Sequence, residues 1–147
     1  MAKQLKLKIV TPEKLILEEL VDQVTLPTTE GELTILPDHV SMIAGLASGD
    51  VVASVNGDLV PMAVSGGFIE VKNVDGKTEV AILADFAEHV ADITEDVIKQ
   101  AEAKAEQLKK QSDNKEVVDF EHFASELERS LTRVKIADKW RTRKYRK

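Results

Sequence analysis

The sequence predicts a β + α fold, in which an N-terminal antiparallel β-sandwich or barrel precedes a C-terminal antiparallel two-helix hairpin. The first observation is the distribution of breakers, because all four prolines and all seven glycines lie at or before Gly76. The second is the period of the apolar residues, which is two in the first part and approaches 3.6 after Ala87. We therefore expect a sandwich domain over residues 1–88 and a helical domain with a basic tail over residues 89–147.

Turn signals recur about every 8–12 residues in the first part, a rhythm typical of sandwiches and barrels. Between them, Leu5, Leu7 and Ile9 alternate with lysines, which places the apolar side chains on one sheet face. Val80 to Leu83 is apolar without alternation and is expected to form a central strand. The turn signals are Thr11-Pro12, Pro27 to Gly31, Pro37-Asp38, Ser48 to Asp50, Asn56-Gly57, Gly66-Gly67 and Asp75-Gly76.

Two apolar stripes predict the helices of the second part. Thr94 can cap the first helix, so that Glu95 and Asp96 meet the positive end of its dipole. A short polar connector, Gln111 to Lys115, separates the stripes and favours an antiparallel hairpin. The first stripe is Val97, Ala101, Ala105 and Leu108, and the second is Phe120, Ala124, Leu127, Leu131 and Val134.

The predicted hairpin has few large apolar residues. A buried Leu or Phe contributes roughly 1.5–3 kcal/mol, whereas each ordered residue costs about 1.5 kcal/mol of conformational entropy. The hairpin therefore needs a support, which could be the sandwich or a partner protein. A hairpin with two supports could move between them.

Charge is distributed unevenly along the chain. Residues 1–128 contain 11 Lys/Arg and 25 Asp/Glu, a net −14, while residues 129–147 contain 9 and 1, a net +8. Such a basic pole could meet nucleic acid, acidic lipid or an acidic protein, or it could be a solvated tail. Trp140 and Tyr145 are interleaved with its bases, as in some binders of single-stranded nucleic acid, but two aromatics provide a small stacking surface.

The chain has no cysteine, which excludes disulfides, thiolate metal sites and cysteine nucleophiles. Its start, MAKQLKLKIV, lacks the apolar run of a signal peptide or a membrane-spanning helix. We therefore expect a soluble protein whose membrane association comes only through a partner.

Residues that could carry chemistry are scattered. His39, His89 and His122 lack the spacing of zinc ligands, so no metal is expected. Glu30 and Glu32 flank Gly31 in a predicted polar loop, where nothing would shift the pKa values of an acid/base pair. Ser65-Gly66-Gly67 lacks the lysine and helix of a phosphate loop and is interpreted as a bulge or tight turn. We therefore expect no catalytic residues and no enzyme activity of the isolated chain.

Three segments carry a resemblance that is more specific than the architecture. EGELTILPDH (Glu30 to His39), VSGGFIEV (Val64 to Val71) and VAILADFA (Val80 to Ala87) resemble the characteristic segments of the epsilon subunits of F-type, bacterial-type ATP synthases. Their order and spacing also match. The resemblance extends over the whole chain, because that family follows its sandwich with two helices.

The resemblance implies a non-catalytic central-stalk subunit of a proton-translocating ATP synthase. Its expected partners are the gamma subunit, the c ring and the catalytic beta subunits, with no nucleic acid. By the match of Glu30 to His39, the residues expected to contact the c ring are Glu32 and His39. The sandwich would bind the rotor, and the hairpin would regulate the enzyme by inhibiting ATP hydrolysis. The resemblance assigns the contact with an acidic motif on beta to Arg129, Arg133 and Lys135.

Some members of the family bind ATP between their two helices. Arg129 and Arg133 match the helix-two arginines and would be the nucleotide contacts, but the Asp and Arg of the helix-one motif are missing from Ile93 to Ile98. We therefore expect no cofactor. The expected location is peripheral, on the cytoplasmic face of a bacterial inner membrane, with the stromal face of a plastid thylakoid as the alternative.

One other function is compatible with the charge pattern. A free-standing β-sandwich adaptor could bind nucleic acid or an acidic protein through its basic C-terminal helix, although this leaves the three matched segments unexplained. Co-purification separates the two hypotheses, because an epsilon subunit brings down gamma, whereas the adaptor brings down nucleic acid in a salt-sensitive manner.

Overall fold

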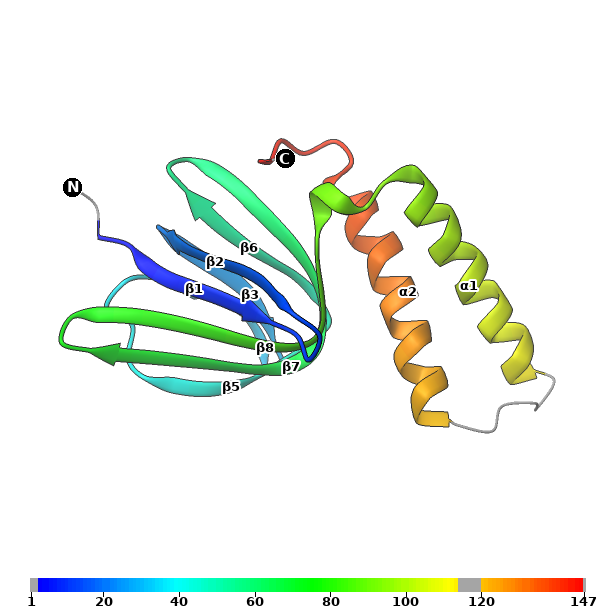
Figure 1. The fold of residues 1–147 in the computed structure, drawn as a ribbon, viewed down its shortest axis with the longest axis horizontal. Helices are drawn as coiled ribbons and strands as arrows, with labels where there is room; N and C mark the ends of the chain where they lie inside the picture. The colour runs from blue at the N-terminus through cyan, green and yellow to red at the C-terminus, as the bar shows by residue number, and fades with distance from the viewer. Residues whose placement is uncertain (1–2, 114–119, 147) are drawn as a thin grey trace.

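The computed structural model describes residues 3–113 and 120–146, which form an eight-stranded β-sandwich followed by two helices (Figure 1). This confirms the predicted fold class. The strands are β1 (Leu5–Val10), β2 (Leu15–Val21), β3 (Gln23–Thr28), β4 (Gly31–Ile35), β5 (Met42–Leu46), β6 (Gly49–Val55), β7 (Asp58–Val74) and β8 (Lys77–His89). A 3₁₀ turn, η1 (Val90–Asp92), leads to α1 (Glu95–Asp113) and α2 (Phe120–Trp140).

The strands pair in the order β2-β1-β8-β7-β5-β3-β4, and β6 pairs with both β3 and β7. All ladders are antiparallel except that between β1 and β8, which is parallel. The long strand β7 belongs to two layers, because its residues 58–64 pair with β6 and its residues 67–71 pair with β5. The change of partner falls at Gly66 and Gly67.

Gly66 and Gly67 therefore form neither a bulge nor a turn. The register of β7 against β8 runs unshifted from Ser65 opposite Phe86 to Gly67 opposite Ala84. Both glycines have positive φ, +67° and +131°, which bends the strand where it changes layers. The bend thus comes from backbone angles that glycine adopts readily.

The sandwich has its own apolar core. Leu5, Leu7 and Ile9 are completely buried, as their alternation predicts. Asn56 and Gly57 form the expected two-residue hairpin, with φ of 51° and 88° between the paired residues Val55 and Asp58. Pro27, in contrast, lies inside β3, and the turn that follows is shorter than predicted because Thr28 already pairs with Gly31.

The first helix begins where the sequence predicts. The Thr94 hydroxyl accepts a hydrogen bond from the Val97 amide at 3.3 Å, and α1 starts at Glu95. Ala101, Ala105 and Leu108 are buried, but Ile98 is more buried than the predicted Val97. The helix continues through Asp113, so Gln111 to Asp113 are not connector; the remaining connector residues, 114–115, lie outside the described residues.

The second predicted stripe is wrong. On α2, Ala124 and Leu131 are exposed and Leu127 and Val134 are half-buried; the side chain of Phe120 lies outside the described part. The buried residues of α2 are Phe123, Ser130, Thr132, Ile136, Ala137 and Trp140. The periodicity could not reveal this, because α2 packs against both α1 and the sandwich.

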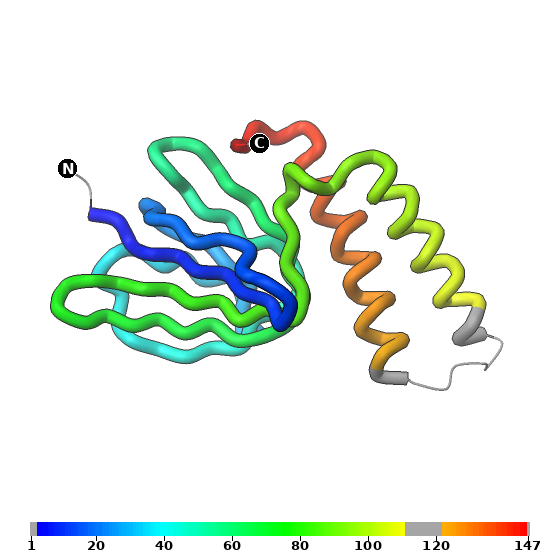
Figure 2. The backbone as a smooth tube through the Cα atoms, viewed as in Figure 1, coloured from blue at the N-terminus to red at the C-terminus, as the bar shows by residue number. Residues whose placement is uncertain are grey.

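The hairpin rests on the sandwich, as its few apolar residues require. A second cluster joins Ala63 of β7 to Ile98 of α1 and to Ile136, Ala137 and Trp140 of α2. Figures 1 and 2 show α2 between the sandwich and α1. Strand β8 ends at His89, one residue beyond the predicted domain boundary.

Candidate functional site

Two arginines of α2 lie at the junction between the hairpin and the sandwich. Arg133 donates two hydrogen bonds to the Glu88 carboxylate, at 2.8 and 2.9 Å. Arg129 donates to the backbone carbonyl of Asp85 at 3.2 Å. Both guanidinium carbons lie near the Phe86 ring, 5.6 and 5.4 Å from its centroid. We call these five residues the arginine junction.

The arginine junction is positioned by local structure on both sides. A spacing of four residues puts Arg129 and Arg133 on one side of α2, and β8 supplies Asp85, Phe86 and Glu88. The cavity beside them is also bordered by Lys14 and His89. The sequence predicted the two arginines as contact residues but not their sandwich partners, because nothing in the chain order links β8 to α2.

Lys135, the third predicted basic residue, lies elsewhere on α2. It is exposed and borders an open groove with Ala124, Leu127 and Leu131. We call this feature the α2 groove. It contains most of the stripe that the sequence assigned to the helix–helix seam. The structure thus brings Arg129 and Arg133 together but places Lys135 beside partly exposed apolar residues.

The predicted contact residues Glu32 and His39 are not brought together. Glu32 is exposed near the start of β4, an edge strand, so half of the segment Glu30 to His39 is strand rather than the expected polar loop. His39 lies in the turn beyond the other end of β4, where its Nδ1 lies 2.8 Å from the Val40 carbonyl. The backbone amide of Asp38 donates to the Thr78 hydroxyl at 2.7 Å, which ties this turn to β8.

The outer face of the β5-β7-β8 layer carries large exposed apolar side chains. Ile43 is 75% exposed, Phe68 64% and Leu83 50%. Phe68 and Leu83 are register partners, and Ile43 lies in the adjacent row opposite Glu70. Three neighbouring residues on one sheet face form a continuous surface, which we call the outer apolar patch. The sequence placed Leu83 in a central apolar strand and did not indicate that its outward-facing side chain would be exposed.

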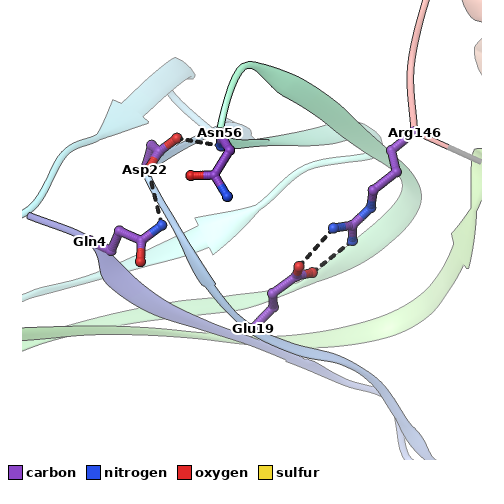
Figure 3. A network of polar contacts seen from close by, with 5 residues as sticks. All are labelled: Gln4, Glu19, Asp22, Asn56 and Arg146. Atoms are coloured by element: carbon purple, nitrogen blue, oxygen red, sulfur yellow. Dashed lines mark hydrogen bonds and ion pairs between the residues drawn. The ribbon is translucent and has the colours of Figure 1, made fainter. Parts of the chain in front are cut away.

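The C-terminal segment returns to the sandwich instead of continuing the helix. Trp140 Nε1 donates to Asp50 at 2.9 Å, and Lys139 forms an ion pair with the same carboxylate at 2.8 Å. Arg146 donates two hydrogen bonds to Glu19, both at 2.7 Å (Figure 3). The hydrogen-bonded Arg146 lowers the pKa of the Glu19 carboxyl, and Glu19 raises the pKa of the Arg146 guanidinium.

Within residues 3–113 and 120–146, no group of three or more His, Cys, Asp or Glu side chains is arranged to hold a metal ion. Over the same residues, neither helix is long and apolar enough to cross a membrane.

Comparison with known proteins gives a consistent result. The model of the family described as "ATP synthase, Delta/Epsilon chain, beta-sandwich domain" matches residues 4–90. The ATP synthase epsilon chain of Nitratidesulfovibrio vulgaris (strain DP4) is 40% identical over 136 residues, which are 92% of this chain and 97% of that one. The ATP synthase epsilon chain of Desulforamulus reducens is 38% identical and is covered along 100% of its length.

The chain belongs to the ATP synthase epsilon-chain family. The match confirms the predicted family and makes the chain a non-catalytic subunit of the ATP synthase. Because the relatives are matched along nearly their whole length, both the sandwich and the hairpin belong to the epsilon chain. This membership decides against the free-standing adaptor.

A solved structure shares the fold of this epsilon-family chain. A chain of the Euglena gracilis mitochondrial ATP synthase, from a cryo-EM structure of its OSCP/F1/c-ring part, superposes with a TM-score of 0.66. It is 23% identical to the present chain, and the match covers 92% of this chain and 80% of that one.

Proposed function

We propose that this chain couples the gamma subunit to the c ring in the central stalk and that its hairpin inhibits ATP hydrolysis. The observation that carries the proposal is the presence of two apolar clusters. One lies wholly within the sandwich, and a smaller one joins the sandwich to the hairpin. A module with its own core can hold one partner permanently, whereas an appendage with a small contact can change partners.

The outer apolar patch is the proposed gamma contact. Large apolar side chains exposed on one rigid sheet face are typical of a protein-binding surface. Phe68 is the aromatic anchor of the patch, and aromatic anchors contribute most to the binding energy of such surfaces. Lys8 and Glu70, in the row next to Phe68, provide a polar rim.

The edge strand β4 and the following turn are the proposed c-ring contact. Glu32 is exposed on the edge strand, and His39 lies in a turn held by the bond from Asp38 to Thr78. Glu32→Ala combined with His39→Ala should weaken the coupling of ATPase activity to proton transport without unfolding the sandwich. Unchanged proton-coupled activity would reject this assignment.

The inhibitory surface combines the arginines with the α2 groove. Arg129 and Arg133 are the proposed contacts to an acidic motif on beta, and Lys135 lies beside the uncovered apolar side chains. In the compact structure Arg133 is paired with Glu88, so beta and the sandwich would compete for the same guanidinium. Opposite charges across the beta contact should make inhibition weaken as salt increases.

A reconstituted complex tests the inhibitory role directly. ATP hydrolysis should rise when a chain lacking residues 129–147 replaces the intact chain, because the truncation removes Arg129 and Arg133 together with Leu131 and Lys135 of the groove. The increase should be largest at low ionic strength. Equal hydrolysis by the two complexes at low ionic strength would contradict the proposal.

We also propose that the chain acts without a nucleotide of its own. Arg129 and Arg133 already have partners in the arginine junction, and the helix-one Asp and Arg are missing. Isothermal titration of the chain with ATP and magnesium should show no binding heat, and a saturating heat signal would reject this expectation. We place the chain at the cytoplasmic face of a bacterial inner membrane; the bacterial origin of both relatives supports this location.

A further inference from the structure

The segment from Lys139 to Arg146 runs from the end of α2 back over the sandwich and ends beside β6 (Figure 1). It begins beside β6, where Lys139 and Trp140 share the Asp50 carboxylate. It ends at Arg146, whose side chain binds Glu19 of β2 and whose amide donates to the Leu59 carbonyl of β7 at 2.8 Å. Figure 3 shows Arg146 reaching Glu19 from the C-terminal segment. Strands β2, β6 and β7 are thereby joined to one short segment that lies far from all of them in sequence.

Trp140 anchors the start of this segment. Its side chain is 2% exposed and packs in the cluster between hairpin and sandwich. Its indole N–H donates to Asp50, and the Tyr145 ring meets it edge-on with centroids 5.8 Å apart. A tryptophan that is both buried and hydrogen-bonded fixes position and orientation together, which a solvated tail would not require.

Arg146 anchors the other end at an unusual place in the sheet. Glu19 shares its row with the buried residues Leu7 and Val80, so it belongs to the inner face of β2. β2 is an edge strand, and an inward charge there needs a partner. Arg146 provides that partner with two parallel hydrogen bonds, and the Leu59 contact fixes the backbone of the same residue.

We propose that the segment from Lys139 to Arg146 is a clasp that holds the helical hairpin against the sandwich and must open before the hairpin can leave. The +8 charge of residues 129–147 then acts on the chain's own body, whose first 128 residues carry −14. The clasp keeps the hairpin on the sandwich, whereas Arg129 and Arg133 would contact beta once the hairpin has left it. The same basic region would therefore both oppose and promote inhibition. That functional consequence rests on the proposed inhibitory role, whereas the clasp itself rests on the contacts of the isolated chain.

The isolated chain contains its own probe, because Trp140 is the single tryptophan. Arg146→Glu should open the clasp, shift Trp140 emission to longer wavelength and increase its quenching by acrylamide. Hydrogen exchange of the α1 and α2 amides should accelerate about tenfold, as expected for the loss of a charge-assisted hydrogen-bond pair. Lys144→Glu is the matched control, because Lys144 is exposed and makes no bond with the described residues.

Two further variants distinguish clasp opening from unfolding. Glu19→Arg combined with Arg146→Glu restores the ion pair with its charges exchanged, and should return both emission and exchange towards the wild-type values. Asp50→Ala removes the acceptor at the other end and should also expose Trp140. If Trp140 emission and hairpin exchange are unchanged in both Arg146→Glu and Asp50→Ala, the clasp is refuted. Equal effects of Lys144→Glu and Arg146→Glu would also refute it.

Hydrolysis by the reconstituted complex separates the clasp from the proposed function. If both ideas hold, Arg146→Glu lowers ATP hydrolysis, whereas removal of residues 129–147 raises it. Exposure of Trp140 with no change in hydrolysis would support the clasp and contradict the inhibitory role.

Discussion

At the scale of single residues, the importance of Gly67 and Glu19 for stability follows from the backbone angle of the first and the inward position of the second, which residue type alone does not indicate. Gly67 lies where β7 changes layers, and a Cβ built there would lie 2.0 Å from the Leu83 carbonyl oxygen. Glu19 would be an ordinary surface carboxylate if its side chain pointed to the outer face of β2. Its importance comes from the edge position and from Arg146.

Gly67→Ala should destabilise the sandwich by about 3 kcal/mol or more, since it combines an unfavourable φ with a backbone clash. Gly31→Ala is the matched control, because Gly31 has a similar φ of +120° and nothing within 4 Å of its Cβ position. It should cost about 1–2 kcal/mol. Urea unfolding of both variants measures the difference, and equal losses would show that the neighbouring strand yields to the added methyl group.

The Glu19 carboxyl makes the clasp sensitive to acid. Arg146, and to a smaller extent His89, hold the pKa of Glu19 below its usual value of 4.5. The ion pair therefore contributes fully above the ordinary glutamate range and is lost as the pH falls through the lowered pKa. Asp58 faces Arg146 and helps to raise the pKa of that guanidinium, which stays charged throughout this range.

We accordingly expect Trp140 emission to stay constant between neutral pH and about pH 5, and to shift to longer wavelength in stronger acid. In Glu19→Gln the shift associated with this group should be absent, and emission should already be displaced at neutral pH. A fluorescence titration of the two proteins measures this, and coincident curves would contradict the assigned contact.

At the scale of elements, α2 has two apolar faces that differ in how far they are buried. One face carries Ile136, Ala137 and Trp140 and is covered by the sandwich. The other face, the α2 groove, carries the half-buried Leu127 and the exposed Leu131, and no other described element lines it. A helix that is apolar on an uncovered face retains the capacity to bind a second partner. This division supports the movement of the hairpin that the proposed function requires.

Two substitutions on α2 should therefore separate stability from inhibition. Leu131 is 45% exposed, so Leu131→Ser should change the stability of the isolated chain by less than about 0.5 kcal/mol. In the complex it should weaken inhibition of ATP hydrolysis. Ile136 is 4% exposed, and Ile136→Ala should destabilise the hairpin by about 2–4 kcal/mol. Thermal unfolding and hydrolysis assays measure the two effects, and normal inhibition by Leu131→Ser would exclude the groove.

At the scale of the whole molecule, the chain presents its surfaces on different sides. The outer apolar patch belongs to the β5-β7-β8 layer, the edge strand β4 lies at one end of the strand order, and the hairpin packs against β6 and β7. Separate surfaces allow the sandwich to keep one partner while the hairpin exchanges another.

Phe68→Glu should accordingly abolish or strongly weaken gamma binding while leaving the isolated fold intact, because Phe68 is largely exposed. Loss of a buried aromatic anchor typically costs about 2 kcal/mol or more, which is at least a 30-fold weaker Kd. Val74→Glu changes another exposed apolar residue of β7, near its turn with β8, and serves as the control. Equal affinity of both variants for gamma would remove the patch from the interface.

The sequence alone determined the order of elements, the Thr94 cap, the Asn56-Gly57 turn and the family. Breakers, the period-two alternation of Leu5 to Ile9 and the Thr94 cap act over a few residues, so the local pattern contains the information. The three matched segments predicted the epsilon family for the same reason.

Only the tertiary structure decided which surfaces are open and which charges are paired. The stripe of α2 was misplaced because the helix packs against both the sandwich and α1. Half of the segment Glu30 to His39 is strand, because residues 31–35 pair with β3. Arg133 with Glu88, and Arg146 with Glu19, pair across 45 and 127 residues of sequence. Such contacts depend on how distant segments pack together, and chain order does not specify that packing.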